Sequence, residues 1–236
     1  MPNNDASTGG TAAIVLAAGS SARMGGVDKL WADLLGRPLV AHSIATLGTL
    51  EGVRTLVLVG PAPRHDDLTA CAAEAAARGV EVRCVEGGTR RQDSVAAALR
   101  AAPDAGWYLV HDGARPFVSA ALARRVLEGA RRHGAAIPGV PVTDTIKHID
   151  GDGRILATVE RASLRAVQTP QGFAGTLLRR AHAEVAGDVT DDAAMVEWLG
   201  LPVFVVPGDP ANMKVTTPTD LTVARALLAA GPPQEA

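Results

Sequence analysis

Short segments rich in valine, leucine and isoleucine alternate with longer alanine-rich segments along almost the whole chain of 236 residues. The first of the short segments, residues 12–18 (AAIVLAA), contains no polar residue and ends at Gly19. Such a segment is typical of a parallel strand that is buried on both faces, with helices as the crossover connections. The alternation therefore predicts an α/β fold: a doubly wound, mostly parallel sheet with helices on both faces.

The expected elements can be placed from their apolar periodicity and from glycine and proline signals at their ends. Strands are expected at residues 12–18, 53–59, 80–85, 107–110, 135–140, 164–168 and 202–206. Helices are expected at residues 38–50, 66–78, 92–102, 120–133, 176–185, 191–199 and 219–230. We interpret residues 12–230 as a single domain, with a flexible N-terminal tail at 1–11 and a flexible C-terminal tail at 231–236.

The alternation breaks at residues 145–159, where TIKHID and RILATV flank the turn Gly151-Asp152-Gly153. Two alternating segments around such a turn predict a β-hairpin. A hairpin has no place to pair inside a parallel sheet, so we expect an arm at about residues 143–161 that projects from the domain. A projecting arm commonly packs against another subunit, and the alternative is a hairpin that lies over its own domain.

Composition excludes several classes of protein. No apolar run reaches the roughly 18 to 20 residues of a membrane span, and the first ten residues lack the pattern of a secretory signal, so we expect a cytoplasmic protein without a membrane partner. A formal net charge of -2 and only 3% aromatic residues argue against nucleic-acid binding. Two cysteines, Cys71 and Cys84, are too few for a disulfide framework or a zinc site with four cysteine ligands.

Ligands of open α/β sheets bind beyond the carboxyl ends of the strands, which directs attention to the segment after the first strand. Residues 16–29 are rich in glycine and small residues and contain two cations, Arg23 and Lys29. Backbone N–H groups and cations of this kind favour a phosphate-binding loop, whereas the alternative is a flexible turn with solvated cations. The dinucleotide fingerprint fails because its second glycine falls at Ser21, and a P-loop fails because Leu30 follows the lysine.

A carboxylate stands at the end of the fourth expected strand, at Asp112 in the segment HDGARP. Facing a phosphate loop, it is suited to hold Mg²⁺, which prefers oxygen ligands and substrate phosphates. We interpret the neighbouring His111 as a packing residue, with a metal ligand as the weaker alternative. The segment GGTRRQDSV opens a helix, and free N–H groups at a helix N-terminus bind anions. Lysine occurs only at Lys29, Lys147 and Lys214 among 23 lysines and arginines.

The combination of motifs is more specific than any one of them. The segments LAAGSSARM…DK, GGTRRQDSV, HDGARP, PVTDTIK, VERASL, QTPQGF, VTDDA and NMKVT occur in this order. Over residues 12–230 the chain thereby resembles the 2-C-methyl-D-erythritol 4-phosphate cytidylyltransferase family. The resemblance implies a Rossmann-like nucleotidyltransferase fold, a homodimer that exchanges its arm, and transfer of CMP from CTP to 2-C-methyl-D-erythritol 4-phosphate. Pyrophosphate and 4-CDP-2-C-methyl-D-erythritol would be the products, in non-mevalonate isoprenoid precursor synthesis, with Mg²⁺ as cofactor.

The resemblance also implies a role for individual residues. The catalytic residues would be Arg23 and Lys29, which stabilise the transition state, and Arg161 and Lys214, which position the attacking phosphate. The metal ligand would be Asp112. CTP would be bound by Ala17, Ala18, Gly19, Ser20, Gly88, Thr89, Ser94, Asp112, Gly113 and Ala114. The phosphorylated acceptor would be bound by Asp112, Arg115, Thr145, Arg161, Thr169, Thr190 and Lys214, with Thr145 and Arg161 serving the partner's site.

Other functions stay open at this point. A cytidylyltransferase for ribitol 5-phosphate or another polyol phosphate would use much the same loop. A guanylyltransferase of molybdopterin type would give the arm and the DTIK segment no role. A non-catalytic nucleotide-binding module would have no need for the whole set of cations together with Asp112. The chain also departs from the family pattern, since Asp28 stands where proline commonly precedes the lysine.

Overall fold

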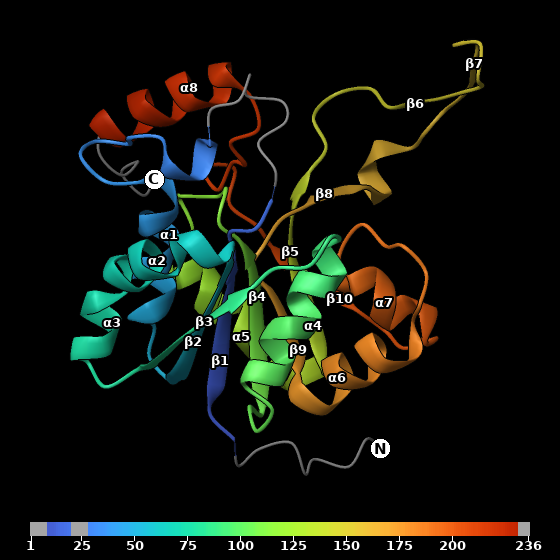
Figure 1. Ribbon diagram of the computed structural model, residues 1–236. Helices are drawn as coiled ribbons and strands as arrows, with labels where there is room; N and C mark the ends of the chain where they lie inside the picture. Colours follow the sequence, from blue (N-terminus) through green and yellow to red (C-terminus); the bar gives the residue numbers. More distant parts are fainter. Residues whose placement is uncertain (1–8, 20–27, 231–236) are drawn as a thin grey trace.

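The computed structural model describes residues 9–19 and 28–230 of the chain. The flexible tails predicted at residues 1–11 and 231–236 lie outside these ranges, except for residues 9–11. The domain predicted from residue 12 to residue 230 corresponds to an eight-stranded sheet with helices on both sides and a separate hairpin (Figure 1).

The sheet has the strand order β10-β5-β9-β4-β1-β2-β3, and β8 pairs with β5 beside this path. The strands are β1 (Thr11–Leu16), β2 (Val53–Gly60), β3 (Glu81–Glu86), β4 (Trp107–Asp112), β5 (Ala135–Pro141), β8 (Arg165–Val167), β9 (Gln171–Ala174) and β10 (Phe204–Pro207). The pairs β1–β2, β2–β3, β1–β4 and β5–β10 are parallel. The chain runs from β1 to β2 and β3 on one side and then returns to place β4 on the other side, so the strand order reverses between β1 and β4.

Helices cover both faces and build two separate cores. One core receives side chains from α1 (Leu39–Gly48), α2 (His65–Cys71), α3 (Ala73–Ala77), α5 (Ala120–His133) and α8 (Pro218–Ala229). The other receives side chains from α4 (Arg91–Ala101), α6 (Gly175–Glu184) and α7 (Asp192–Trp198). Along β1, Ala13 and Val15 enter the first core while Ala12 and Ile14 enter the second. Burial on both faces explains why the sequence of this strand has no polar residue after Thr11.

Strand β9 is absent from the sequence prediction. It is antiparallel to both neighbours, with Phe173 opposite Tyr108 of β4 and Ala135 of β5. It has four residues, and one of them is Gly172, where an added Cβ would lie 2.9 Å from a Val126 methyl carbon. A segment this short with glycine in it has no readable period, so its position in the middle of the sheet depends on packing rather than on local sequence.

The helix predicted at residues 66–78 is two helices, α2 and α3, which meet at Ala72. The backbone of Ala72 has φ of -96° and ψ of 8°, and its N–H donates to the Thr69 carbonyl three residues back. An alanine-rich segment contains no residue that marks this tightened turn, so the sequence alone did not predict the break.

The predicted arm is a hairpin of β6 (Lys147–Ile149) and β7 (Ile155–Thr158), which pair only with each other. Its turn is held by Asp150, whose carboxylate accepts hydrogen bonds from the N–H groups of Asp152 and Arg154 at 3.1 and 2.8 Å. All seven strand residues are exposed, and Figure 1 shows the arm projecting from the sheet. The prediction of a projecting hairpin is therefore confirmed.

Three short 3-10 helices complete the described elements: η2 (Lys29–Trp31), η3 (Ala62–Arg64) and η4 (Arg161–Ser163). None of the helices in the described ranges is long and apolar enough to span a membrane.

Candidate active site

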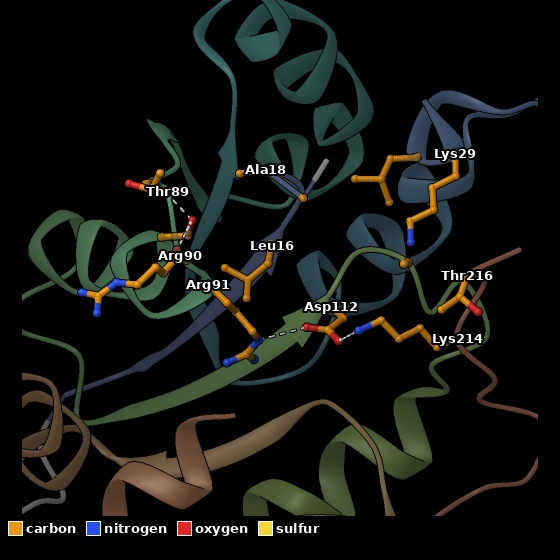
Figure 2. Close-up of a pocket in the computed structure, with 14 residues that line it drawn as sticks. Leu16, Ala18, Lys29, Thr89, Arg90, Arg91, Asp112, Lys214 and Thr216 are labelled. Carbon is orange, nitrogen blue, oxygen red and sulfur yellow. Dashed lines mark hydrogen bonds and ion pairs between the residues drawn. The ribbon is translucent and has the colours of Figure 1, made fainter. Parts of the chain in front are cut away.

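A cavity of about 410 Å³ opens where the strand order reverses, at the carboxyl ends of β1, β3 and β4 (Figure 2). This is the position where open α/β sheets bind ligands. Its walls come from the ends of these strands, from η2, from the start of α4 and from the segment before α8. The lining residues are Leu16, Ala18, Gly19, Lys29, Leu30, Gly88, Thr89, Arg90, Arg91, Ser94, Asp112, Ala114, Lys214 and Thr216.

Asp112, the last residue of β4, lies between two cations on the floor of the cavity. Its Oδ2 is 2.7 Å from Lys214 Nζ and its Oδ1 is 3.4 Å from Arg91 Nε. Burial by itself would raise the pKa of this carboxyl group. The positive charges of Arg91 and Lys214 outweigh burial and hold the pKa of Asp112 well below its usual range, so the side chain is an anion.

A line of hydrogen bonds behind Asp112 fixes the end of β4. The Asp112 N–H donates to Thr169 Oγ1 at 3.0 Å, and the same hydroxyl lies 3.0 Å from His111 Nδ1. The His111 Nε2 lies 3.1 Å from the Arg115 carbonyl oxygen, which can only accept, so Nε2 carries the proton. Burial lowers the pKa of His111 to about 4, which makes the ring neutral near pH 7. His111 lies outside the lining, in agreement with its interpretation as a packing residue.

The segment that carries Lys214 is tied to the same strand end. The buried Asn212 donates from Nδ2 to the Thr169 carbonyl at 2.8 Å, and Arg115 donates to the Asn212 carbonyl at 2.8 Å. One residue after Lys214, the Val215 N–H donates to the Ala114 carbonyl at 2.9 Å. Three contacts thus place a lysine from the end of the chain beside Asp112.

The wall formed by the segment after β3 needs small residues. A Cβ added to Gly87 would lie 2.2 Å from the Ala18 Cβ, and one added to Gly88 would lie 2.3 Å from the Asp93 Cβ. The Gly88 N–H donates to Ser94 Oγ at 3.1 Å, which closes the turn onto the first turn of α4. The absence of side chains lets this turn pack directly against the loop after β1 and keeps the cavity open above it.

Lys29 enters the cavity from the side opposite the turn after β3. It is the first residue of η2, and Asp28 caps this short helix by accepting a hydrogen bond from the Leu30 N–H at 3.2 Å. Figure 2 shows the Lys29 side chain extending into the space above Asp112 and Lys214. The acidic residue at position 28 therefore caps the short helix that begins with Lys29.

Arg91 has no assigned role in the sequence motifs, but it contributes a partly buried cation to the site. It is the first residue of α4 and contacts Asp112 on one side and the buried Asp192 on the other, where Nη1 lies 2.6 Å from Oδ2. Asp192 and Asp112 outweigh the effect of burial and raise the pKa of Arg91 above its usual value. In the sequence, the one indication of this role was the position of Arg91 in the segment GGTRRQDSV, at the start of a helix that follows a strand.

The described structure brings together most of the predicted residues but not all of them. Those that line the cavity are Ala18, Gly19, Lys29, Gly88, Thr89, Ser94, Asp112, Ala114 and Lys214. Those outside its lining are Ala17, Gly113, Arg115, Thr145, Arg161, Thr169 and Thr190. Ser20 and Arg23 lie outside the described residues.

The residues outside the lining include two distinct groups. Ala17, Gly113, Arg115 and Thr169 lie directly behind the cavity wall, where their contacts support it. Thr145 and Arg161 lie at the base of the arm, where both are exposed and Arg161 donates to the Thr143 carbonyl. The arrangement within one chain therefore does not place these two residues next to Asp112.

The donor set at the cavity suits a magnesium ion that is shared with a ligand. Within residues 9–19 and 28–230, no three His, Cys, Asp or Glu side chains gather into a preformed metal cluster. Asp112 is the carboxylate that lines the described part of the cavity, and it is ionised. Mg²⁺ is commonly held by one or two carboxylates together with substrate phosphates and water, so one anionic oxygen donor fits this mode of binding.

The chain is similar to known proteins over most of its length. The family model for 2-C-methyl-D-erythritol 4-phosphate cytidylyltransferase matches residues 11–230. The enzyme of this name from Prochlorococcus marinus strain MIT 9313 is 44% identical over 221 residues, which cover 92% of this chain and 97% of the relative.

Solved structures show the same relationship. The crystal structure of 2-C-methyl-D-erythritol 4-phosphate cytidylyltransferase from Thermus thermophilus has a TM-score of 0.75 and 36% identity, over 92% of this chain and 98% of that one. The 4-diphosphocytidyl-2C-methyl-D-erythritol synthase from Anaerococcus prevotii has a TM-score of 0.83 and 28% identity, over 94% and 96% of the two chains. The family model, at residues 11–230, includes the strands that border the cavity.

Proposed function

The chain belongs to the 2-C-methyl-D-erythritol 4-phosphate cytidylyltransferase family, and we propose that the cavity around Asp112 is where it carries out the family's reaction. The enzyme transfers CMP from CTP to 2-C-methyl-D-erythritol 4-phosphate and releases pyrophosphate. The product is 4-CDP-2-C-methyl-D-erythritol, an intermediate of isoprenoid precursor synthesis. The observation that carries the location is an ionised aspartate between two cations, at the point where the strand order reverses.

The reaction needs charge stabilisation more than it needs a protein nucleophile. A phosphate oxygen of the acceptor attacks the α-phosphorus of CTP, a new P–O bond forms, and the bond to the bridging oxygen of pyrophosphate breaks. The attacking phosphate is already an anion, so alignment and neutralisation of charge supply the catalysis. The described lining agrees with this requirement, because it contains lysine and arginine side chains but neither cysteine nor histidine.

We assign the nucleotide to the side of the cavity formed by the loops after β1 and β3. There, Ala18, Gly88 and Ser94 form a narrow wall without long side chains, suited to a flat base and a ribose. Lys29 extends into the space where a triphosphate would follow, and it would stabilise negative charge on the leaving pyrophosphate. Other residues proposed to take part in binding CTP are Ala17, Gly19, Ser20, Thr89, Gly113 and Ala114, together with the cation Arg23.

Asp112 is the residue proposed to hold magnesium. Magnesium held by Asp112 would supply positive charge that lowers the repulsion between the triphosphate and an incoming phosphate. The neighbouring contacts prepare the carboxylate for this role. Arg91 and Lys214 keep it ionised, and the hydrogen bond from its N–H to Thr169 fixes its position at the end of β4.

We place the acceptor phosphate beside Lys214, which is half exposed and points into the cavity. The residues proposed to complete this side are Arg115, Thr145, Arg161, Thr169 and Thr190. Thr169 is buried and its hydroxyl contacts His111 and Asp112, so it would act by holding Asp112 in place. Thr145 precedes β6, Arg161 follows β7, and both residues are exposed. We therefore propose a homodimer in which each arm brings them to the partner's cavity. We also propose that the protein is cytoplasmic.

Pyrophosphate release from the purified full chain tests this assignment. CTP, UTP and GTP are each combined with 2-C-methyl-D-erythritol 4-phosphate and with ribitol 5-phosphate, in the presence of Mg²⁺ and after its removal with EDTA. We expect turnover with CTP and methylerythritol phosphate, loss of turnover in EDTA, and recovery on adding Mg²⁺. Full activity in EDTA would contradict the magnesium role of Asp112, and a preference for ribitol 5-phosphate would contradict the assigned acceptor.

A further inference from the structure

Arg91 is held by a line of buried contacts that leads away from the cavity. Its Nη1 is 2.6 Å from Asp192 Oδ2, and the other oxygen of this carboxylate, Oδ1, is 3.0 Å from His182 Nε2. Asp192 is the first residue of α7 and His182 lies in the last turn of α6. Side chains from α6, α7, α4 and β4 are thereby joined in the order His182, Asp192, Arg91 and Asp112.

The two residues of this line that are farther along it from Asp112 are inside the protein. The side chain of Asp192 is 0% exposed and that of His182 is 5% exposed. Burial would raise the pKa of Asp192, but the charge of Arg91 outweighs it and the pKa stays below its usual range. A buried carboxylate that has a cation on one side and an imidazole on the other has little freedom to rotate.

The three nitrogens of the Arg91 guanidinium group have different contacts. Nε contacts Asp112 and Nη1 contacts Asp192, whereas Nη2 is buried and has no hydrogen-bond partner among the described residues. Because the group is planar, the contact with Asp192 determines which edge faces Asp112. The position of Arg91 is therefore determined by Asp192, which lies outside the cavity lining.

The adjacent Arg90 provides a contrast. It also lines the cavity and pairs with two aspartates, Asp93 at 2.7 Å and Asp188 at 2.9 Å, but Asp188 is 82% exposed. Exposed ion pairs contribute little and exchange readily with water. The two neighbouring arginines thus differ in the burial of the carboxylates that hold them: Asp192 is 0% exposed, whereas Asp93 is 34% and Asp188 is 82% exposed.

We propose that Asp192, held by His182, is a positioning residue for cytidylyl transfer: it fixes Arg91, and Arg91 fixes the carboxylate of Asp112. The proposal rests on the role of Asp112 given above. Without the Asp192 charge, Arg91 turns its guanidinium group toward Asp112 and the open cavity, and the carboxylate changes its orientation. A misplacement of about 1 Å in a catalytic group costs on the order of 10²-fold in rate.

A double-mutant cycle on the full chain tests the proposal. Steady-state kinetics are measured for Asp192→Asn, for Arg91→Gln and for the double variant, with thermal unfolding recorded for each. We expect Asp192→Asn to lower kcat by roughly 10-fold to 10²-fold, with a change of less than about threefold in KM for CTP, because the wall that holds the nucleoside is untouched. In the Arg91→Gln background the same substitution should change kcat by less than about twofold.

The matched control is Asp188→Asn, the same substitution at the exposed partner of Arg90, for which we expect kcat within about twofold of wild type. If Asp192→Asn does not fold, the cycle is run with His182→Gln, for which we expect a smaller loss that also disappears in the Arg91→Gln background. Losses that multiply independently, or a wild-type kcat for the folded Asp192→Asn or His182→Gln protein, would overturn the proposal. Asp112→Asn tests the proposed function separately, because full activity of that variant would remove the role of Asp112 whatever the coupling between Arg91 and Asp192.

Discussion

Lys214 Nζ lies 2.7 Å from Asp112 Oδ2, although 102 residues separate the two along the chain. The contact joins the end of β4 to the segment between β10 and α8, and the hydrogen bond from the Val215 N–H to the Ala114 carbonyl holds the two segments together. The cation proposed to receive the acceptor phosphate is therefore positioned by the same carboxylate that is proposed to hold magnesium. One consequence is that the shape of the cation, as well as its charge, is important at this position.

Replacement of Lys214 by arginine should therefore not be conservative. Arginine is longer and presents a planar fork, which pairs with both oxygens of Asp112 where lysine contacts one. We expect Lys214→Arg to lower kcat/KM for methylerythritol phosphate by about 10-fold and Lys214→Ala by about 10²-fold, with a smaller effect on KM for CTP. Steady-state kinetics with each substrate varied in turn provide the measurement.

Lys147 offers the matched control, because it is an exposed lysine on β6 whose Nζ donates to Thr158 at 2.7 Å. Lys147→Arg should leave kcat/KM within about twofold of wild type, because it keeps the charge of an exposed side chain that does not contact Asp112. A Lys214→Arg enzyme as active as wild type would show that a compact cation is not required beside Asp112.

The alternation of apolar and alanine-rich segments was sufficient to predict the two-sided sheet, because a strand buried on both faces has an unmistakable composition. It was not sufficient to predict β9, since a four-residue strand with a glycine obtains its position from the neighbours β4 and β5 rather than from its own sequence. The break at Ala72 was missed for a related reason, because alanine fits both a helix and the tight turn between two helices.

The site residues also differ in whether the sequence around them is sufficient to predict their roles. Asp112 and Gly88 could be predicted as site residues because Asp112 ends a strand and Gly88 closely follows one. Such positions converge at one edge of a parallel sheet. The role of Arg91 depends on Asp192, which lies 101 residues further along the chain and on another helix. A contact of this kind has no signal in the sequence near either residue, so the buried partners of the site required a structure.

Mixed dimers should show whether the sites are shared between subunits. We expect Lys29→Ala alone to lower kcat by roughly 10²-fold or more, because a charge-stabilising group is lost. If Arg161 serves the partner's cavity, a mixed dimer of Lys29→Ala and Arg161→Ala chains contains one site with neither substitution. After random exchange of subunits, activity should recover to roughly a quarter of the wild-type value.

The measurement is pyrophosphate release after the two variants have been mixed, with exchange verified by two affinity tags. Each variant incubated alone under the same conditions is the control, and neither should gain activity. Verified exchange without recovery would contradict the shared site.

A methyl group at Gly87 should disturb the nucleotide side of the cavity. The added Cβ would lie 2.2 Å from the Ala18 Cβ and 3.1 Å from Ser94 Oγ, and Ala18 closely follows a buried strand that cannot move easily. We expect Gly87→Ala to raise KM for CTP by about 10-fold and to lower the free energy of unfolding by about 1 to 3 kcal/mol. Kinetics with CTP varied, together with urea unfolding, measure the two effects.

Gly151, at the tip of the arm, is the control position, because an added Cβ there meets nothing within 4 Å. Gly151→Ala should leave KM for CTP and the free energy of unfolding close to wild type. An unchanged KM for CTP in Gly87→Ala would mean that the wall between β1 and β3 does not bind the nucleotide.

Hydrogen bonds to the Asp220 carboxylate at the start of α8 should make the stability of the protein depend on pH at acidic pH. The Asp220 carboxylate accepts hydrogen bonds from the Thr216 hydroxyl at 2.6 Å, the Thr216 N–H at 2.7 Å and the Thr217 N–H at 2.8 Å. These donors, the Thr216 hydroxyl foremost, lower the pKa of Asp220 from 3.8 to about 2. A carboxyl group with a lowered pKa binds fewer protons in the folded state than in the unfolded state. Its stabilising effect is therefore complete above about pH 4 and is lost as the pH falls toward 2.

Asp220→Asn keeps the shape of the side chain but removes its charge, and we expect it to lower the free energy of unfolding by about 1 kcal/mol at pH 7. The difference between the two proteins should stay constant from pH 7 to pH 5 and should decrease below pH 4, because the Asp220 carboxyl group of the unfolded wild-type chain then takes up a proton while that of the folded chain stays mostly ionised. Urea unfolding of both proteins at pH 7, 5 and 3 measures this, with Asp66→Asn in the first turn of α2 as the control. A difference that persists undiminished at pH 3 would show that the charge of Asp220 is not what stabilises the start of α8.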